Sequence, residues 1–216
     1  MGKQDWFRKT TWSVKEKTQF YERLNRSRTD YNKAQYLRIQ ASHLQTAKPP
    51  YYEEAIELID YLLQYYPHIS QLAGAYMQKA QCLEALGNIS DAKDAYLLSL
   101  IAEETSSGVK TTAPLEFAMF VIRHSLKELY DKVFHTLIQD NIKMLTLFPA
   151  RHYQACAALA IIADETGNKD EARKFAQKAL DSAKVKDTGL RYHPKIGLVH
   201  NQNRKLQRKL EKIAHD

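Results

Sequence analysis

Apolar residues recur every three or four positions along most of this chain, and two segments repeat nearly the same pattern around a glycine. The first segment surrounds Gly87 with apolar or small residues at helical spacing, namely Tyr76, Ala80, Leu83, Ala92, Tyr96 and Leu100. The second surrounds Gly167 in the same way, with Cys156, Leu159, Ala160, Ala163, Ala172, Ala176 and Ala179. This spacing places side chains on one face of an α-helix, and glycine commonly ends a helix. Each segment therefore predicts two helices joined by a short turn.

Two further hairpins are predicted from the same periodicity. "AQYLRIQASHL" and "YYEEAIELIDYLLQYYP" form one around the turn "KPP". Residues 113–149 contain another apolar helix pair, with a first helix over 113–130 and a second over 131–149 that ends at Pro149. Only 7 glycines and 6 prolines occur in the chain, which favours long helices over a sheet with many turns. The predicted fold is all-α, with about four antiparallel helix hairpins over residues 33–184.

Single helices are predicted on either side of these hairpins. Ser13 and Glu16 stand at the spacing of a capping box, which predicts a helix over residues 13–28. At the other end, "NRKLQRKLEKIAHD" predicts a basic helix with a few apolar residues on one face. The chain is thereby divided into an aromatic leader with a capping helix (1–32), an array of hairpins (33–184) and a closing segment with a basic helix (185–216).

Alanines occupy matching places in the two glycine-centred hairpins. Antiparallel helices approach closely only where side chains are short, so Ala80 and Ala92 suit a close contact between two helices. Residues 73–104 and 153–184 thereby resemble the tetratricopeptide repeat (TPR), a 34-residue helix hairpin. Lys79 stands where that repeat has an apolar residue. The resemblance implies that the hairpins stack as a TPR-like α-solenoid.

Three longer stretches resemble a group of bacterial TPR proteins of unassigned role: "DWFRKTTW" near the N-terminus, "AQYLRIQA" after it, and the closing "RYHPKIGLV". This resemblance implies a helical array that holds another protein on its concave face, as a scaffold or adaptor, and it supplies no catalytic residues. Repeat proteins of this kind also occur as immunity proteins that neutralise a cognate bacterial toxin. That role is therefore an alternative for this chain.

The net charge of +7 is concentrated at the two ends of the chain. Residues 1–30 carry +4, residues 31–183 carry −3 and residues 184–216 carry +6. Association with nucleic acid through the basic termini is therefore a further alternative. No apolar run approaches the roughly 18–20 residues of a membrane-spanning helix, and the N-terminus lacks the apolar core of a signal peptide. The expected location is cytoplasmic.

Polar residues within the first helices of the hairpins are the candidate contacts with a partner. Arg38 interrupts the apolar "YLRIQA", and Arg123 interrupts "FAMFVIRH". In helical arrays the first helices line the concave surface, where an arginine can bind a carboxylate of a partner chain. Internal salt bridges with Asp60 or Glu116 are the alternative. The predicted partner-binding residues are Arg38, Gln78, Gln81, Glu84, Arg123 and His193.

No enzyme motif is present in sequence order. The chain lacks a phosphate-binding glycine loop, a dinucleotide-binding motif and a His-Glu-x-x-His helix. His124 and His135 fall on neighbouring predicted helices, but ordinary histidines are favoured there over a metal site. Cys82 and Cys156 are expected to be buried free thiols, with no second Cys or His at ligand spacing. We therefore predict a non-enzymatic protein with no cofactor and no metal.

The aromatic leader and the basic tail pose a choice between packing and recognition. Trp6, Phe7 and Trp12 are predicted to form a clasp on the first hairpins, and a hook for a partner is the alternative. The basic C-terminal helix is predicted to dock its apolar residues on the array. Contact with a membrane surface, nucleic acid or an acidic partner is the alternative for that helix.

The closing segment poses the same choice. Gly189 lets the chain leave the last repeat helix, and Pro194 favours an extended segment. Its apolar residues are predicted to lie over an exposed helix face, namely Ile196, Leu198 and Val199. Recognition of a partner through Tyr192 and His193 is the alternative.

Overall fold

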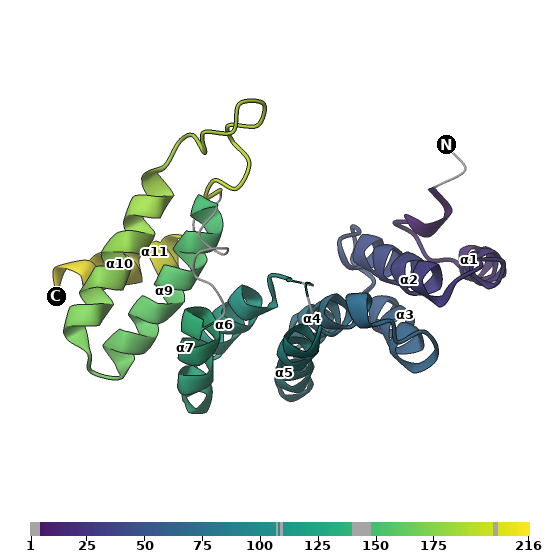
Figure 1. Cartoon of the computed structure of the whole chain (residues 1–216), viewed down its shortest axis with the longest axis horizontal. Helices are drawn as coiled ribbons and strands as arrows, with labels where there is room; N and C mark the ends of the chain where they lie inside the picture. The colour runs from purple at the N-terminus through teal and green to yellow at the C-terminus, as the bar shows by residue number, and fades with distance from the viewer. Residues whose placement is uncertain (1–4, 107, 109, 140–147, 201–202) are drawn as a thin grey trace. The chain divides into compact units, whose positions relative to one another are not determined.

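The computed structural model describes residues 5–106, 108, 110–139, 148–200 and 203–216, and every regular element among them is a helix. The chain forms two compact units, residues 1–113 and 114–216, which are described separately (Figure 1). The predicted all-α class is confirmed.

The first unit stacks its helices in chain order. It contains a short 3₁₀ turn, η1 (Asp5–Phe7), and the helices α1 (Val14–Asn25), α2 (Asp30–Gln45), α3 (Tyr52–Tyr65), α4 (Ile69–Ala85) and α5 (Ile89–Thr105). Each α-helix packs against the next, and α2 also contacts α4. The turn between α4 and α5 contains Gly87 at φ 82°, a left-handed conformation that glycine adopts without strain. The two hairpins predicted in this part of the chain are therefore confirmed.

Helix α1 begins where the capping box places it. Ser13 N donates to Glu16 Oε2 at 2.9 Å, and Glu16 N donates to Ser13 Oγ at 3.3 Å. These two bonds satisfy backbone N–H groups that the start of a helix leaves without intrahelical partners. The hydrogen bond from the Ser13 backbone is also the main reason that the pKa of Glu16 lies below its ordinary value.

The aromatic leader packs onto α1 and α2. Phe7 and Trp12 are 7% and 9% exposed. The Trp6 ring lies 5.3 Å from the Phe20 ring and 5.0 Å from the Tyr36 ring, measured between centroids. Aromatic pairs at such distances add to the stability gained from burying the rings. The leader is thus the predicted clasp.

A buried glutamine of α2 fixes the backbone of this leader. Lys9 N donates to Gln40 Oε1 at 3.0 Å, and Gln40 Nε2 donates to Lys9 O at 2.7 Å. Gln40 is 0% exposed, so both bonds satisfy polar groups that would otherwise be buried without partners. The clasp is therefore held by polar contacts as well as by its rings.

Lys79, the departure from the repeat pattern, is an ion-pair partner and not a core residue. Its Nζ lies 2.5 Å from Asp60 Oδ1, which joins α4 to α3. Both side chains are partly exposed, so the pair adds little to stability. Its main consequence is that Asp60 is engaged by a cation other than Arg38.

The second unit contains α6 (Ala113–Arg123), a 3₁₀ turn η2 (Lys127–Leu129), α7 (Tyr130–Gln139), α9 (Pro149–Glu165), α10 (Lys169–Lys184) and α11 (Arg204–His215). Helices α9 and α10 pack closely together, α11 packs on both, and α7 contacts α9. Small residues line the α9–α10 contact and are 0% exposed there: Ala157, Ala160, Ala172, Ala176 and Ala179. The hairpin predicted at residues 153–184 is confirmed.

The third hairpin differs from its prediction. Its first helix was expected to continue to Tyr130, but it ends at Arg123, and Ser125 takes a left-handed conformation, φ 53°, that interrupts a right-handed helix. Pro149, predicted to end this hairpin, begins α9 instead. Proline suits that position because the first N–H groups of a helix have no intrahelical partner. Residues 140–147, predicted to continue the second helix, lie outside the described residues.

The basic C-terminal helix is docked through its apolar face, as predicted. Leu210 and Ile213 are 0% and 4% exposed and belong to the α9–α10 core. Lys209 Nζ lies 2.8 Å from Glu165 Oε1, and the Tyr130 hydroxyl donates to Glu165 Oε2 at 2.6 Å, so one carboxylate joins α11, α9 and α7. Several cations of α11 stay exposed, namely Arg204, Lys205, Arg208 and Lys212.

The predicted extended segment over a helix face is wrong for residues 190–196. Turns replace it because Thr188 N donates to Pro194 O at 2.9 Å, which closes the chain on itself. Ile196 is 50% exposed and Tyr192 is 77% exposed. This part of the closing segment therefore projects from the second unit.

Only the end of the closing segment is packed. Gly197 lies against Phe148, where a Cβ would overlap the ring, and its carbonyl accepts from Ala150 N at 2.8 Å. Val199 packs against the core of the second unit. The projecting turns are therefore anchored at the start of α9.

Gln40→Ala tests the attachment of the leader. The change removes both hydrogen bonds to Lys9, so we expect the free energy of unfolding to fall by about 1–3 kcal/mol in urea denaturation. The tryptophan fluorescence of the folded variant should shift to longer wavelength, because Trp6 and Trp12 lie on the same leader. Gln64→Ala, at an exposed position of α3, is the control and should cost less than about 0.5 kcal/mol. Similar losses in both variants would contradict the role given to Gln40.

Candidate partner-binding site

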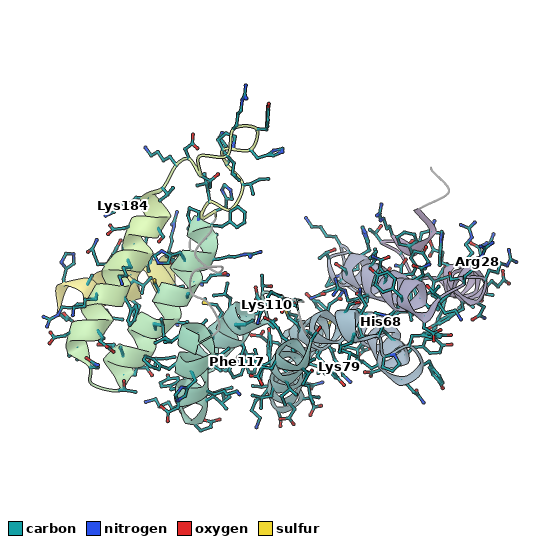
Figure 2. All side chains as sticks on the ribbon, in the orientation of Figure 1. Arg28, His68, Lys79, Lys110, Phe117 and Lys184 are labelled. Atoms are coloured by element: carbon teal, nitrogen blue, oxygen red, sulfur yellow. The ribbon has the colours of Figure 1, made fainter. Side chains whose placement is uncertain are left out.

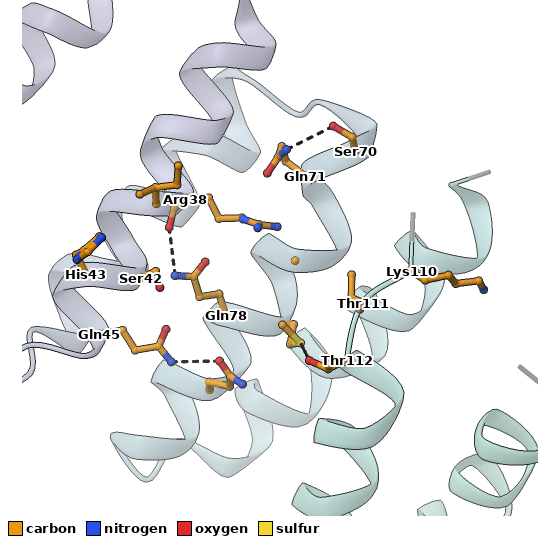
Figure 3. Close-up of a pocket in the computed structure, with 14 residues that line it drawn as sticks. Arg38, Ser42, His43, Gln45, Ser70, Gln71, Gln78, Lys110, Thr111 and Thr112 are labelled. Carbon is orange, nitrogen blue, oxygen red and sulfur yellow. Dashed lines mark hydrogen bonds between the residues drawn. The ribbon is translucent and has the colours of Figure 1, made fainter. Parts of the chain in front are cut away.

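A pocket of about 550 Å³ opens in the first unit between α2, α4 and the segment that follows α5 (Figure 3). Its volume lies in the range of roughly 300–1,000 Å³ that is usual for ligand pockets. The pocket is lined by Arg38, Ile39, Ser42, His43, Gln45, Ser70, Gln71, Gly74, Met77, Gln78, Gln81, Lys110, Thr111 and Thr112. Cationic and neutral polar side chains predominate in this lining, and it contains no carboxylate.

Arg38 supplies the main charge of the pocket. Figure 3 shows its guanidinium group directed away from α2 toward α4. Gly74 of α4 makes room for it, because a Cβ at that position would overlap Nη1 of Arg38. Burial lowers the pKa of Arg38, an effect that Tyr31 partly opposes, but a guanidinium keeps its charge in proteins.

No counter-ion of Arg38 is found among the described residues. None of the ion pairs there includes Arg38, and Asp60, one of its two expected partners, pairs with Lys79. A half-buried cation without a counter-ion favours the binding of an anion. The pocket can therefore attract a carboxylate.

Glutamines of α4 place further polar groups beside this cation. Gln78 Nε2 donates to Arg38 O at 3.3 Å, and Gln81 Oε1 accepts from Gln45 Nε2 at 3.2 Å. Gln71 is only 8% exposed, and its Oε1 is buried without a hydrogen-bond partner. A buried acceptor without a donor costs about 1–3 kcal/mol, so a bound N–H or O–H group would remove that cost.

The third wall of the pocket is held by a buried carboxylate. Glu103 of α5 is 5% exposed and accepts from both Thr111 N, at 3.0 Å, and the Thr111 hydroxyl. Lys110 Nζ lies 3.9 Å from the other carboxylate oxygen. Thr112 Oγ1 contacts Met77 Sδ of α4 at 3.6 Å. These contacts fix the segment after α5 against α4.

The structure brings together three of the six predicted partner-binding residues. Arg38, Gln78 and Gln81 line the pocket. Glu84 lies on α4 but is not among the lining residues, and its role stays a prediction. Arg123 and His193 belong to the second unit, on α6 and in the projecting turns, and both are exposed.

Residues missed by sequence reasoning complete the site. Gln71, Gly74, Gln78 and Gln81 follow one another at intervals of three or four along α4, so one face of this helix is polar or small where the opposite face is apolar. Extending the spacing backwards from Gln78 would have found the first two. Thr112 could not be found in this way, because only its tertiary contact with Met77 brings it to α4.

Cys156 also has a partner that was overlooked. His152 stands four residues before it on α9, and the ring Nε2 lies 3.4 Å from Cys156 Sγ. His152 Nδ1 lies 2.7 Å from Ser182 Oγ, which donates to Lys178 O at 2.8 Å. The hydroxyl therefore accepts from Nδ1–H, and Nε2 accepts from the thiol. The expectation that no His stands near either cysteine at ligand spacing is wrong.

Both groups of this pair are uncharged near neutral pH. Burial raises the pKa of Cys156 to about 11, although Lys178 opposes the shift, and burial followed by Lys178 lowers the pKa of His152. Burial likewise raises the pKa of Cys82 to about 12. A protonated thiol is a weak nucleophile and a weak metal ligand.

The two histidines considered as metal ligands have ring contacts with different residues. The His124 ring lies 4.9 Å from Phe120 and the His135 ring lies 6.4 Å from Phe134. Among the described residues, no three His, Cys, Asp or Glu side chains gather in a way that could hold a metal ion.

Comparison with known proteins identifies one segment of the chain. The tetratricopeptide-repeat family model matches residues 153–185, which is the α9–α10 hairpin. No curated protein and no solved structure compared with the chain matches it significantly. Within the part of the chain that the structure describes, no helix has the length and apolar character needed to cross a bilayer.

The raised thiol pKa values predict slow cysteine chemistry. At pH 7 the thiolate fraction of Cys156 should be roughly 100-fold smaller than that of a free cysteine, so an aromatic disulfide reagent should react with the folded protein correspondingly slowly. Both thiols should react at the ordinary rate in denaturant. A fast reaction of one thiol in the folded protein, lost in Cys156→Ser, would mean that His152 takes the thiol proton.

Proposed function

We propose that this chain is a tetratricopeptide-repeat protein and that, as a non-enzymatic interaction module, it binds a carboxylate of a protein partner in the α2–α4 pocket. Tetratricopeptide repeats generally mediate protein–protein interaction, which supports a scaffold or adaptor role. The pocket adds a chemical preference to that role. The observation that carries the proposal is the half-buried Arg38, which faces the pocket and has no counter-ion among the residues that the structure describes.

The geometry supports an acidic residue within a peptide segment. A guanidinium binds a carboxylate through two parallel N–H···O bonds. The residues that line the pocket include no carboxylate that would compete with a ligand for Arg38. Gln71 Oε1 can accept a backbone N–H of the same segment. A ligand that offers a carboxylate and an amide N–H would thereby satisfy both unpaired groups of the pocket.

An immunity protein is one version of this function. It would occupy a toxin with an acidic surface segment, and it requires tight binding of one cognate partner at a ratio of one to one. A scaffold requires neither a single partner nor high affinity. The measured stoichiometry and partner number therefore distinguish these two versions.

Binding of nucleic acid is a second candidate, because exposed cations of α11 include Arg204, Lys205, Arg208 and Lys212. Phosphate contacts would make such binding collapse between low and physiological salt. It should also disappear in a variant that replaces these four residues by glutamine. Binding that persists at physiological salt and in this variant would instead be assigned to the pocket.

Arg38→Gln tests the pocket directly. Tagged full-length protein is used to capture partners from lysate of its source cells at low and physiological salt, and the affinity of each retained protein is then measured by calorimetry. Loss of the guanidinium should weaken binding at least tenfold, since a paired, partly desolvated charge contributes strongly. Arg28→Gln, at an exposed position of the same unit, should bind normally. Equal affinity of all three proteins would refute the proposal.

Gly74→Ala separates binding from stability. A Cβ at this position would displace only the end of the flexible Arg38 side chain, and alanine favours a helix by about 1 kcal/mol over glycine. The variant should therefore unfold at the same or slightly higher urea concentration, yet bind the partner several-fold more weakly. A stable variant with unchanged affinity would show that the position of the guanidinium is unimportant.

A further inference from the structure

The second unit contains a pocket of its own, between α7 and the C-terminal part of α9. Its volume is about 270 Å³, which is below the usual range for small-molecule ligands and suits one or two side chains. Leu159, Ile162 and Phe134 give it apolar walls, and Phe134 is 38% exposed. Asp131 and Glu171 line the same pocket and give it an acidic edge.

The projecting turns of the closing segment have the opposite character. Leu190 is 42% exposed and Tyr192 is 77% exposed, and the Arg191 guanidinium carbon lies 5.3 Å from the centre of the Tyr192 ring. Figure 2 shows the side chains of the segment that follows Lys184 directed outward. An apolar surface and a cation are thus presented together.

Leu190, Arg191 and Tyr192 form the tip of these turns. Hydrogen bonds within the segment hold the tip in place before any partner binds. His193 N donates to Leu190 O at 3.0 Å, and Gly189 N donates to Asp187 Oδ1 at 2.7 Å. Together with the closure between Thr188 and Pro194, these bonds reduce the entropy that binding would cost. The tip is therefore preorganised for docking.

The charges of the tip and the pocket are complementary. Lys186, Arg191 and Lys195 surround the tip, and its only carboxylate, Asp187, is used within the turn. None of the ion pairs among the described residues includes Arg191 or Asp131. Complementary charges and an exposed aromatic residue facing an apolar recess are common features of protein interfaces.

The tip cannot enter the pocket of its own chain. It is anchored at the start of α9 through Gly197 and Ala150, whereas the pocket includes Ile162 near the other end of that helix. Twelve residues of α-helix separate those positions by roughly 18 Å, and the tip projects away from the helix. A tip that fills this pocket must therefore come from another copy of the chain.

We infer that the Arg191–Tyr192 tip of one copy of this chain binds the α7–α9 pocket of a second copy. The Tyr192 ring packs on the apolar walls, and the Arg191 guanidinium pairs with Asp131 and Glu171. The two surfaces differ, so the contact is heterologous, and a pair of copies keeps one free pocket on the first copy and one free tip on the second. This inference does not depend on the proposed function, because it uses neither Arg38 nor the first unit.

Analytical ultracentrifugation of the full chain tests the inference. The weight-average mass of the wild type should rise above the 25.0 kDa of one chain as concentration increases, and should fall back toward it in high salt. Arg191→Glu and Asp131→Lys should each weaken association at least tenfold. Phe134→Lys is a second pocket variant that leaves the first turn of α7 unchanged. Arg208→Glu is the matched charge control on α11 and should associate like the wild type.

Mixing two blocked variants provides the decisive measurement. Arg191→Glu retains a normal pocket, and Asp131→Lys retains a normal tip, so a mixture should recover the association that each variant alone loses. Circular dichroism melts check that each variant is folded. A wild type that stays monomeric at all accessible concentrations would overturn the inference. Association that Arg191→Glu and both pocket variants leave unchanged, or a mixture of blocked variants that stays monomeric, would overturn it as well.

Discussion

The fold depends on the close approach of consecutive helices, which short side chains make possible. In the α9–α10 hairpin, alanines on both helices are fully buried, so the two backbones come near enough to exclude water along the contact. A larger residue at Ala160 or Ala172 would force the helices apart and leave gaps beside the alanines that remain. This contact between neighbours in sequence replaces the single large core of a globular domain.

Such packing leaves one face of a helix free to carry polar groups. Helix α4 buries Ala73, Ala80 and Leu83, while its other face presents glutamines and Gly74 to the pocket. That face need not be apolar, because the stability of the hairpin comes from the opposite side. The same division explains how one site tolerates two groups that have no partner in the described part of the chain, the buried acceptor of Gln71 and the cation of Arg38.

Much of the fold could be predicted from the sequence because its signals are local. Helical periodicity, the capping box at Ser13 and the turn at Gly87 all act over a few residues. The errors at Ser125 and Pro149 arose where no periodic signal marks a helix end. Three of the six predicted partner-binding residues line the pocket: Arg38, which interrupts an apolar helix, and Gln78 and Gln81, which lie on the polar side of another. Thr112 and the contact of Ser182 with His152 were missed, because tertiary contacts bring Thr112 to Met77 of α4 and Ser182 to His152.

Gln40 binds the leader through the main chain of Lys9, using one donor and one acceptor that every residue except proline possesses. Position 9 can therefore vary widely in evolution without detaching the leader, provided that proline is avoided. The constraint falls instead on position 40, where only an amide side chain of that length offers both complementary groups. An aspartate or glutamate there would lose the donor and place an oxygen against the Lys9 carbonyl. Sequence variability at position 9 would thus reveal nothing about how firmly this segment is held.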